Sequence, residues 1–184
     1  SSTDWNLILV NRDNQQEEKT PDLTQIGEIQ VDSRIAENTR QFLAAAQAIA
    51  PEETLISGYR SRAEQEELYN EKVAGEVAKG LSNEEAVSIV LKQVQLPGAS
   101  EHQTGLAIDM SAPEGQEDEL AAKIAQLAPQ YGFVLRYPDG KSDITGVDFE
   151  NWHYRYVGVE NAQYMQKHNL VLEEYIALLK EAGK

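Results

Sequence analysis

The 184-residue sequence contains no cysteine. A disulfide framework, a thiolate metal site and a cysteine nucleophile are therefore excluded, and any metal ion must be bound through nitrogen and oxygen atoms. Histidine is also scarce, with three residues in the chain. Two of these three lie in segments that are dense with other polar side chains, and this concentration is the main clue to function.

Basic residues are few. The chain has 16 Lys and Arg against 31 Asp and Glu, which gives a formal charge of -15. Binding to a phosphate backbone depends on clustered basic residues, so we expect no nucleic-acid partner. Most of the acidic residues are explained by solvated helix faces, which promote solubility.

Long hydrophobic runs are also absent. No apolar stretch approaches the ~20 residues that a membrane-spanning helix requires, and residues 1–4 do not resemble the start of a signal peptide. A length of 184 residues with 41% hydrophobic content is enough for one core, so we expect a single soluble domain over residues 1–184 and a monomer. A removed signal or lipid anchor would leave no trace in these residues.

Hydrophobic periodicity and capping patterns divide the chain into helices and strands. Strands are predicted at residues 7–10, 54–59, 106–110, 133–137 and 152–157, with a loop at 11–24. A first helix is predicted at 34–50, with Ser33 as its cap. Two more begin at capping boxes: one after Ser61–Glu64, and one at Ser82–Glu85 that continues to residue 94. A helix at 117–131 is expected to be perturbed at Pro129, and residues 160–182 are predicted to be helical in two pieces. The spacing between strands is too irregular for repeated βαβ units. The sequence therefore predicts an α+β fold in which a small, largely antiparallel sheet is packed by helices.

The segment 100–109 carries the first part of a candidate site. His102 and Asp109 are seven residues apart with the turn signal Thr104-Gly105 between them, so a bend could bring both side chains to a common point. Asp109 lies inside the apolar run 106–110, where an unpaired carboxylate would be costly to bury. A bound cation is one way of relieving that cost.

The second part of the candidate site is separated from Asp109 by 43 intervening residues. His153 offers another nitrogen ligand, and Glu150 precedes it by three residues. Catalytic zinc commonly takes three protein ligands and leaves a fourth position for water, whose pKa the metal lowers toward ~7. Glu150 could accept the proton of that water.

Spacing alone leaves other interpretations open. His102 could be a turn residue, Asp109 a cap, and His153 a core histidine beside Trp152. Arg60 lies where a predicted strand leads into a helix, a position that often faces a cleft, but it could equally form a surface salt bridge. His168, on a polar helix, is interpreted as a surface residue.

Three segments together resemble a known family. They are Ser-Gly-Tyr-Arg-Ser at 57–61, Pro-Gly-Ala-Ser-Glu-His-Gln-Thr-Gly-Leu-Ala-Ile-Asp at 97–109, and Trp-His-Tyr-Arg-Tyr-Val-Gly at 152–158. In this order they resemble the VanY-type D-alanyl carboxypeptidases of the LAS metallopeptidase group, which also includes the hedgehog signalling domain. Within that family, the sequence looks most similar to the streptococcal-type L,D-carboxypeptidases (LdcB/DacB). The resemblance covers about residues 54–158 and is weakest at 71–95 and 138–147.

The resemblance implies specific roles for individual residues. Zinc would be bound by His102, Asp109 and His153, with Glu150 as the catalytic base. Arg60 would meet a substrate carboxylate or the developing oxyanion, because a planar guanidinium suits both.

Three further residues would shape the peptide site. Gln65 and Ser100 would line it, and Trp152 would support its wall or fill the core. The implied activity is removal of the C-terminal D-alanine from peptidoglycan stem peptides at the surface of a bacterium. We expect L,D-carboxypeptidase action on the tetrapeptide, with D,D-carboxypeptidase action on the pentapeptide as the alternative. A non-catalytic zinc-binding domain of the hedgehog kind is a second alternative, against which Glu150 and Arg60 both count.

Overall fold

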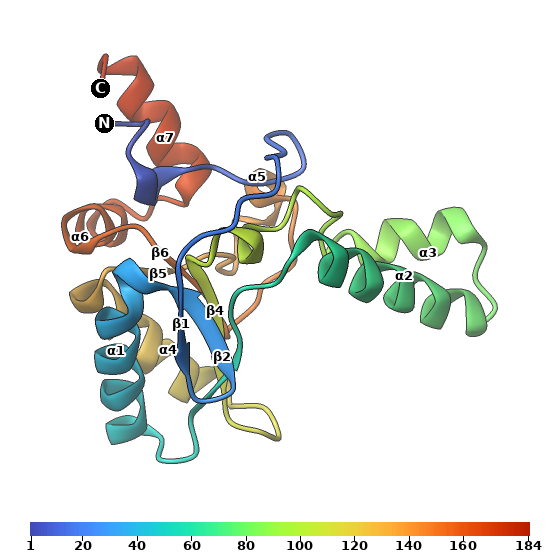
Figure 1. Cartoon of the computed structure of the whole chain (residues 1–184), viewed down its shortest axis with the longest axis horizontal. Helices are drawn as coiled ribbons and strands as arrows, with labels where there is room; N and C mark the ends of the chain where they lie inside the picture. The colour runs from blue at the N-terminus through green and yellow to red at the C-terminus, as the bar shows by residue number, and fades with distance from the viewer.

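A four-stranded antiparallel sheet lies at the centre of the fold (Figure 1). The computed structural model describes residues 1–184, and the strand order in this sheet is β3-β4-β6-β5. The strands are β3 (Thr54–Ser57), β4 (Ala107–Ser111), β5 (Phe133–Leu135) and β6 (His153–Tyr156). The prediction of a mixed fold with a small antiparallel sheet is confirmed.

The register of the sheet separates its core face from its polar face. Asp109 on β4 pairs with Ser57 on one side and with His153 on the other. Because side chains alternate along a strand, the neighbouring Ile108 and Tyr154 face the opposite way and are completely buried in the main core. The two polar residues therefore share one face of the sheet.

Helices α1 (Ala36–Ile49) and α4 (Asp118–Leu127) pack together and contribute to the main core. The predicted Ser33 cap is wrong. The carboxylate of Asp32 instead accepts a 2.9 Å hydrogen bond from the backbone of Arg34 and opens a 3-10 turn, η2 (Ser33–Ile35), that leads into α1. Aspartate is as good a cap as serine, so the neighbouring residue takes the role. The perturbation expected at Pro129 is confirmed, because α4 gives way there to the 3-10 turn η4 (Ala128–Tyr131).

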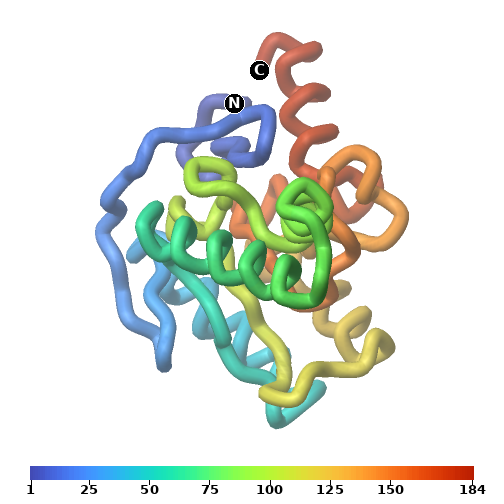
Figure 2. Tube along the Cα trace, turned by 90° about the vertical axis from the view of Figure 1, so that its right-hand side faces the viewer, coloured from blue at the N-terminus to red at the C-terminus, as the bar shows by residue number.

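The C-terminal segment forms two helices, α6 (Val159–Lys167) and α7 (Leu172–Glu181), as predicted. They enclose a second core cluster, which includes Leu7 from the other end of the chain and Val134 from β5. The two chain ends accordingly lie close together in both Figure 1 and Figure 2.

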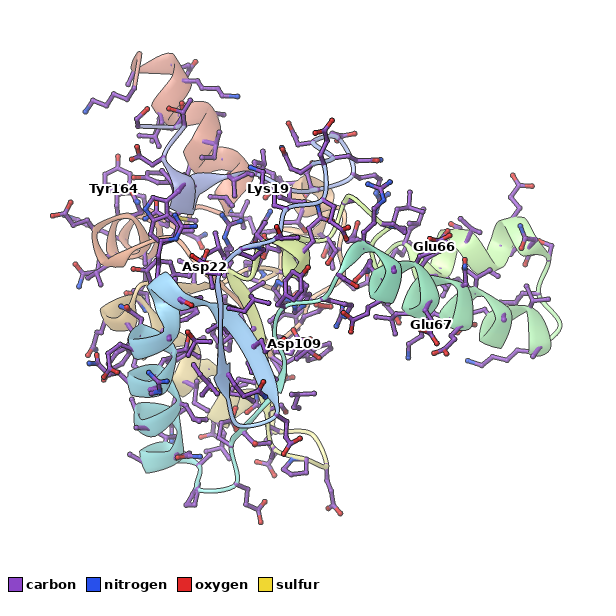
Figure 3. All side chains as sticks on the ribbon, viewed as in Figure 1. Lys19, Asp22, Glu66, Glu67, Asp109 and Tyr164 are labelled. Carbon is purple, nitrogen blue, oxygen red and sulfur yellow. The ribbon has the colours of Figure 1, made fainter.

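A helical hairpin projects from the body of the molecule (Figure 1). It consists of α2 (Arg62–Ala78), which begins with the predicted Ser61 capping box, and α3 (Asn83–Val90). Helix α3 ends four residues earlier than the sequence predicted, in a turn. Figure 3 places Glu66 and Glu67 on the projecting part of α2 and Asp109 in the body of the molecule.

Two other predictions for the N-terminal region are corrected. The predicted strand at 7–10 is absent: Leu7 ends a 3-10 turn, η1 (Trp5–Leu7), and residues 8–10 pair with no strand. The apolar side chains of this run serve packing instead, and Leu7 and Val10 are buried. The loop predicted at 11–24 ends early, since β1 (Leu23–Ile26) and β2 (Ile29–Asp32) form a hairpin that was not predicted.

A short helix, α5 (Ser142–Thr145), was also not predicted. None of the helices combines the length and hydrophobicity needed to span a lipid bilayer.

Candidate metal centre and active site

Three potential metal ligands meet on the polar face of the sheet. One ligand atom from each of His102, Asp109 and His153 lies within 4.8 Å of the other two. The Oδ1 atom of Asp109 is 3.4 Å from Nε2 of His102 and 3.1 Å from Nδ1 of His153. Two imidazole nitrogens and one carboxylate oxygen form a donor set typical of a catalytic zinc site with an open position.

The local structure explains why residues distant in sequence meet here. His102 lies in the 3-10 turn η3 (Glu101–Thr104), which ends at Gly105 with φ of 76°. A Cβ atom at Gly105 would lie 2.9 Å from the backbone nitrogen of Asp32, so glycine is required on both counts. The turn leads directly into β4, where Asp109 lies opposite His153 of β6. The predicted bend between His102 and Asp109 is confirmed.

The outer nitrogen of each histidine ring is held by a protein oxygen. His102 Nδ1 lies 2.9 Å from the carbonyl oxygen of Gly58, and His153 Nε2 lies 2.8 Å from Oε1 of Glu101. These contacts orient Nε2 of His102 and Nδ1 of His153 toward Asp109. Such contacts fix the tautomer and the ring orientation of metal-binding histidines.

The electrostatics of the cluster favour a cation. Burial opposes the ionisation of Asp109, but the neighbouring His102 and His153 hold the pKa of this carboxyl well below its ordinary value. Burial also disfavours the charged form of His153, yet its contacts with Asp109 and Glu101 raise the pKa of the imidazole to about 10. The first shift keeps Asp109 an anionic ligand, and the second shows that the surroundings of His153 stabilise a positive charge at this point of the cluster.

A cleft of about 530 Å³ opens over the cluster, a volume typical of small-ligand sites. All eight site residues expected from the sequence line this cleft: Arg60, Gln65, Ser100, His102, Asp109, Glu150, Trp152 and His153. The structure thus brings together residues from α2, η3, β4, β6 and the loop before β6.

Arg60 is fixed in place by two contacts. Its Nη1 atom donates a 2.8 Å hydrogen bond to Oε1 of Gln65, whose Nε2 atom donates in turn to the carbonyl of Gln95 at 2.7 Å. The backbone nitrogen of Arg60 donates to the carbonyl of His102. The guanidinium is therefore positioned relative to the metal ligands, and both ends of the Gln65 amide are engaged in positioning it.

Glu150 is a buried carboxyl at the wall of the cleft, with 7% of its surface exposed. Its backbone nitrogen donates to the carbonyl of Tyr137, which fixes the loop. Burial raises the pKa of Glu150 to about 7, and the negative charges of Asp109 and Glu101 add to this effect against the opposing influence of His153. A carboxyl whose pKa lies near neutrality is suited to proton transfer.

The outer part of the cleft lies between α2 and the loop before β6. Leu68 and Lys72 line it from α2, and Phe149 and Trp152 line it from the loop. Trp152 is 40% exposed, so its indole is available at the cleft wall and does not fill the core.

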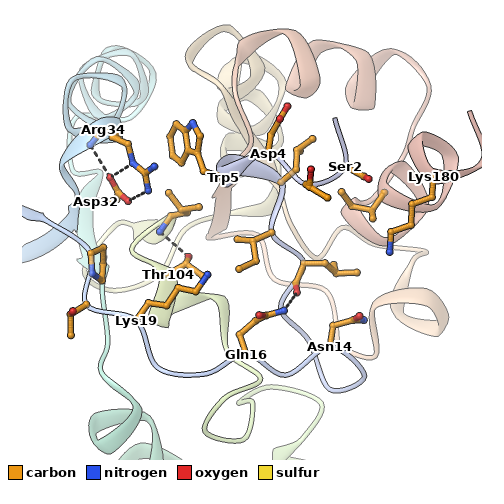
Figure 4. Close-up of a pocket in the computed structure, with 18 residues that line it drawn as sticks. Ser2, Asp4, Trp5, Asn14, Gln16, Lys19, Asp32, Arg34, Thr104 and Lys180 are labelled. Carbon is orange, nitrogen blue, oxygen red and sulfur yellow. Dashed lines mark hydrogen bonds and ion pairs between the residues drawn. The ribbon is translucent and has the colours of Figure 1, made fainter. Parts of the chain in front are cut away.

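A second pocket, of about 570 Å³, lies elsewhere, between the N-terminal segment and α7 (Figure 4). Its lining includes the ion pair between Asp32 and Arg34, and the Arg34 guanidinium lies 3.8 Å above the ring of Trp5. It contains no histidine. The metal-ligand cluster, and not pocket size, therefore identifies the candidate active site.

Glu101 directly precedes His102, but no role was predicted for it. It is completely buried and contacts His153. A buried carboxylate requires partners, but those partners, Arg136 and Arg155, come from distant strands and segments. The only available signal was its place between two polar site residues.

Comparison with known proteins identifies the family. Residues 28–159 match the family model described as VanY, D-alanyl-D-alanine carboxypeptidase. A D-alanyl-D-alanine carboxypeptidase of Enterococcus faecalis is 39% identical over 179 residues, which cover 94% of this chain. The match spans 66% of that relative, so the chain is shorter than the curated protein it resembles.

Solved structures show the same fold. VanYB in complex with D-alanine-D-alanine is 38% identical with a TM-score of 0.88, covering 95% of this chain and 98% of its own. A mutant of the D,D-pentapeptidase VanY from a VanB-type cassette, in complex with Zn(II), is 38% identical with a TM-score of 0.87, covering 94% and 99%. The LD-carboxypeptidase LdcB is 30% identical with a TM-score of 0.73, covering 92% and 84%. The chain therefore belongs to the VanY D-alanyl-D-alanine carboxypeptidase family.

Proposed function

We propose that this protein is a zinc-dependent carboxypeptidase that releases the C-terminal D-alanine from peptidoglycan stem peptides. The observation that carries the proposal is the ligand cluster of His102, Asp109 and His153 in one cleft with Glu150, a carboxyl whose pKa is raised to about 7. A non-catalytic zinc domain would need the three metal ligands, but it would not need a carboxyl such as Glu150 whose pKa lies near neutrality.

The donor set fits zinc. Nitrogen and oxygen ligands in a group of three are the usual protein contribution to a catalytic zinc site, and the related VanY D,D-pentapeptidase is described in complex with Zn(II). His102, Asp109 and His153 would hold the ion. When bound, zinc supplies Lewis-acid chemistry, polarising the scissile carbonyl and making water more acidic.

The other residues of the cleft have complementary tasks. Glu150 accepts a proton from the attacking water and delivers it to the leaving amine of D-alanine. Arg60, held by Gln65, pairs with the C-terminal carboxylate of the substrate or with the developing oxyanion. Ser100 and Trp152 contact the peptide along the walls of the cleft.

The residue before the scissile bond decides between two activities. Similarity to VanYB, which binds D-alanine-D-alanine, favours D,D-carboxypeptidase action on the pentapeptide. Similarity to LdcB favours L,D-carboxypeptidase action on the tetrapeptide, which was the expectation from the sequence. Both activities would use the same metal ligands and the same base.

One experiment tests the activity and the preference together. Purified protein loaded with zinc is incubated with defined tri-, tetra- and pentapeptide stems, and the products are measured by mass spectrometry. Loss of one D-alanine from the pentapeptide or the tetrapeptide is expected, with the tripeptide as the unreactive control. If neither is shortened under conditions where zinc is bound, the proposed function is wrong.

We further infer that residues 1–184 form one peptidase domain that acts as a monomer outside the cell. The two core clusters are joined by β5, which contributes Phe133 to one and Val134 to the other. The inferred location follows from the substrate.

A further inference from the structure

A network of buried charges lies directly behind the metal centre. It consists of Glu101, Arg136, Arg155 and Glu173, and we call it the buried charge network. The side chains of Glu101, Arg136 and Arg155 have no exposed surface, and 14% of the Glu173 side chain is exposed. Burying four charges is costly unless each is paired.

Glu101 divides its two oxygens between different partners. Its Oε1 atom lies 2.8 Å from Nε2 of His153. Its Oε2 atom accepts hydrogen bonds from Nε of Arg136 at 3.0 Å and from Nη1 of Arg155 at 3.1 Å. The two guanidinium groups thus occupy one oxygen and leave the other for the metal-binding imidazole.

Glu173 on α7 fixes the orientation of Arg136. The Nη1 and Nη2 atoms of Arg136 donate to the two oxygens of Glu173 at 2.8 and 2.6 Å. This two-pronged contact orients the guanidinium so that its Nε atom donates to Glu101. Without it, the guanidinium could turn and compete with His153 for Oε1 of Glu101.

The N-terminal segment holds the other side of the network. Arg155 Nη2 donates to the carbonyls of Asn6 at 3.1 Å and Ile8 at 2.8 Å. Asn11 Nδ2 donates to Oε2 of Glu173 at 3.1 Å. These contacts leave each arginine with partners on both sides.

The outer partners lie outside the part of the chain that matches the family model. That match covers residues 28–159, whereas Asn6, Ile8 and Asn11 precede it and Glu173 follows it. The family match contains the metal ligands, Glu101 and both arginines, but not the groups that orient the arginines.

The positive and negative charges of the buried charge network are equal in number only when Glu173 is ionised. Two guanidinium charges face the single carboxylate of Glu101, and Glu173 supplies the second negative charge. If it were neutral, the excess positive charge would weaken the pull of Glu101 on the imidazole of His153. A weaker partner lowers the basicity of a metal-binding histidine and the order of its ring.

We propose that Glu173 is a positioning residue for the metal centre, acting through Arg136 and Glu101 on His153. The inference rests on the proposed metal-binding role of His153. It makes α7, a helix that does not line the catalytic cleft, a part of the metal site.

The test is the zinc affinity of Glu173→Gln in the full chain. Glutamine keeps the shape and one acceptor oxygen but removes the charge. Competition with a chromophoric chelator should show zinc affinity reduced by about 10-fold, the lower end of the range for residues that bond directly to a metal ligand, because Glu173 acts through two intermediate residues. The visible absorption of the cobalt-substituted protein should change as well, because the ligand field depends on the orientation of His153.

Glu174→Gln is the matched control. Glu174 lies on the same helix and its carboxylate bonds to Lys141 and to the backbone of Val171, so its loss weakens α7 without touching the buried charge network. Zinc affinity and the cobalt spectrum should stay at the wild-type values. Unchanged zinc affinity in a folded Glu173→Gln, or an equal loss in Glu174→Gln, would overturn the proposal.

Asn11→Ala covers the case in which Glu173→Gln does not fold. It removes one hydrogen bond to Glu173 and leaves all four charges, so a smaller fall in zinc affinity is expected, and no fall would contradict the proposal. Because the assay measures metal binding, its outcome is independent of the peptidase activity. A protein that binds zinc without releasing D-alanine would refute the proposed function and leave this inference intact.

Discussion

Arg60 donates a 2.8 Å hydrogen bond to Gln65, and Gln65 in turn donates to the carbonyl of Gln95. The arginine therefore reaches the cleft with one of its donors already used for positioning. The remaining donors form a planar fork, which suits a carboxylate better than the single ammonium of lysine does.

Arg60→Lys should accordingly lower kcat/KM by at least about 10-fold, because losing a charge-assisted hydrogen bond costs about 1.5–3 kcal/mol. Steady-state release of D-alanine is the measurement. Arg40→Lys is the control, since Arg40 is an exposed residue of α1 whose partner Glu37 is 3.6 Å away. Wild-type kinetics in Arg60→Lys would assign Arg60 a purely structural role.

His153→Ala should lose zinc, because two protein ligands without a thiolate hold the ion weakly. Elemental analysis after dialysis is expected to give about one zinc per wild-type chain and almost none for the variant. His168→Ala serves as the control, since His168 lies at the end of α6 against Tyr164 and away from the cleft. Full occupancy in His153→Ala would show that the ligand assignment is wrong.

The sequence predicted most of the residues that line the candidate cleft, because they lie in short, ordered motifs. The turn at Gly105 needs a residue that accepts positive φ, and Asp109 inside an apolar run needs a charged partner. Both requirements can be read locally. The buried charge network could not be predicted in this way, because Glu173 meets Arg136 only after β5 and α7 have packed together.

In the fold, too, features set by local sequence were predicted and features set by tertiary packing were not. The strands β3, β4, β5 and β6 and the long helices were predicted from periodicity, but the run 7–10 was mistaken for a strand. Apolar residues of a buried extended segment resemble those of a strand, and only the position of neighbouring chains distinguishes pairing from packing. The hairpin of β1 and β2 was missed because each strand has only four residues, too few for a clear periodicity, and Gly27 is its only clear turn signal.

Glu53 gives a prediction about stability. Neither of its carboxylate oxygens has a hydrogen-bond partner, and burial raises the pKa of Glu53 to about 7. The folded state therefore binds this proton more tightly than the unfolded state, whose pKa is about 4.3. The stabilising contribution is fully present below about pH 4.3 and is lost as the pH rises through 7.

Glu53→Gln should remove the loss of stability that ionisation of Glu53 causes at high pH, because glutamine stays neutral. Its melting temperature is expected to exceed that of the wild type at pH 8 and to approach it at pH 4.5, with zinc removed from both proteins. Glu52→Gln, at the exposed neighbouring position, should show no such pH-dependent difference. A lower melting temperature for Glu53→Gln at pH 8 would mean that the charged carboxylate is stabilised by its surroundings.

Glu150→Gln tests the mechanism most directly. The carboxyl lies in the cleft three residues before His153, and its pKa is raised to about 7, so it can exchange a proton near neutral pH. Glutamine has almost the same size and keeps one acceptor oxygen, but it cannot accept a proton in this range. Turnover should fall by about 10²–10⁴-fold, the contribution typical of general acid–base catalysis.

Zinc content and melting temperature measured on the same preparation distinguish the remaining explanations. If Glu150 were a fourth metal ligand, the variant would lose zinc together with activity. If it were an ordinary surface carboxylate, turnover would match that of Glu160→Gln, a change at an exposed position in the first turn of α6. Retained zinc, an unchanged fold and lost turnover are expected together, because the proposed base acts on the water proton and does not bind the ion. Near-normal cleavage by Glu150→Gln would refute the proposed mechanism.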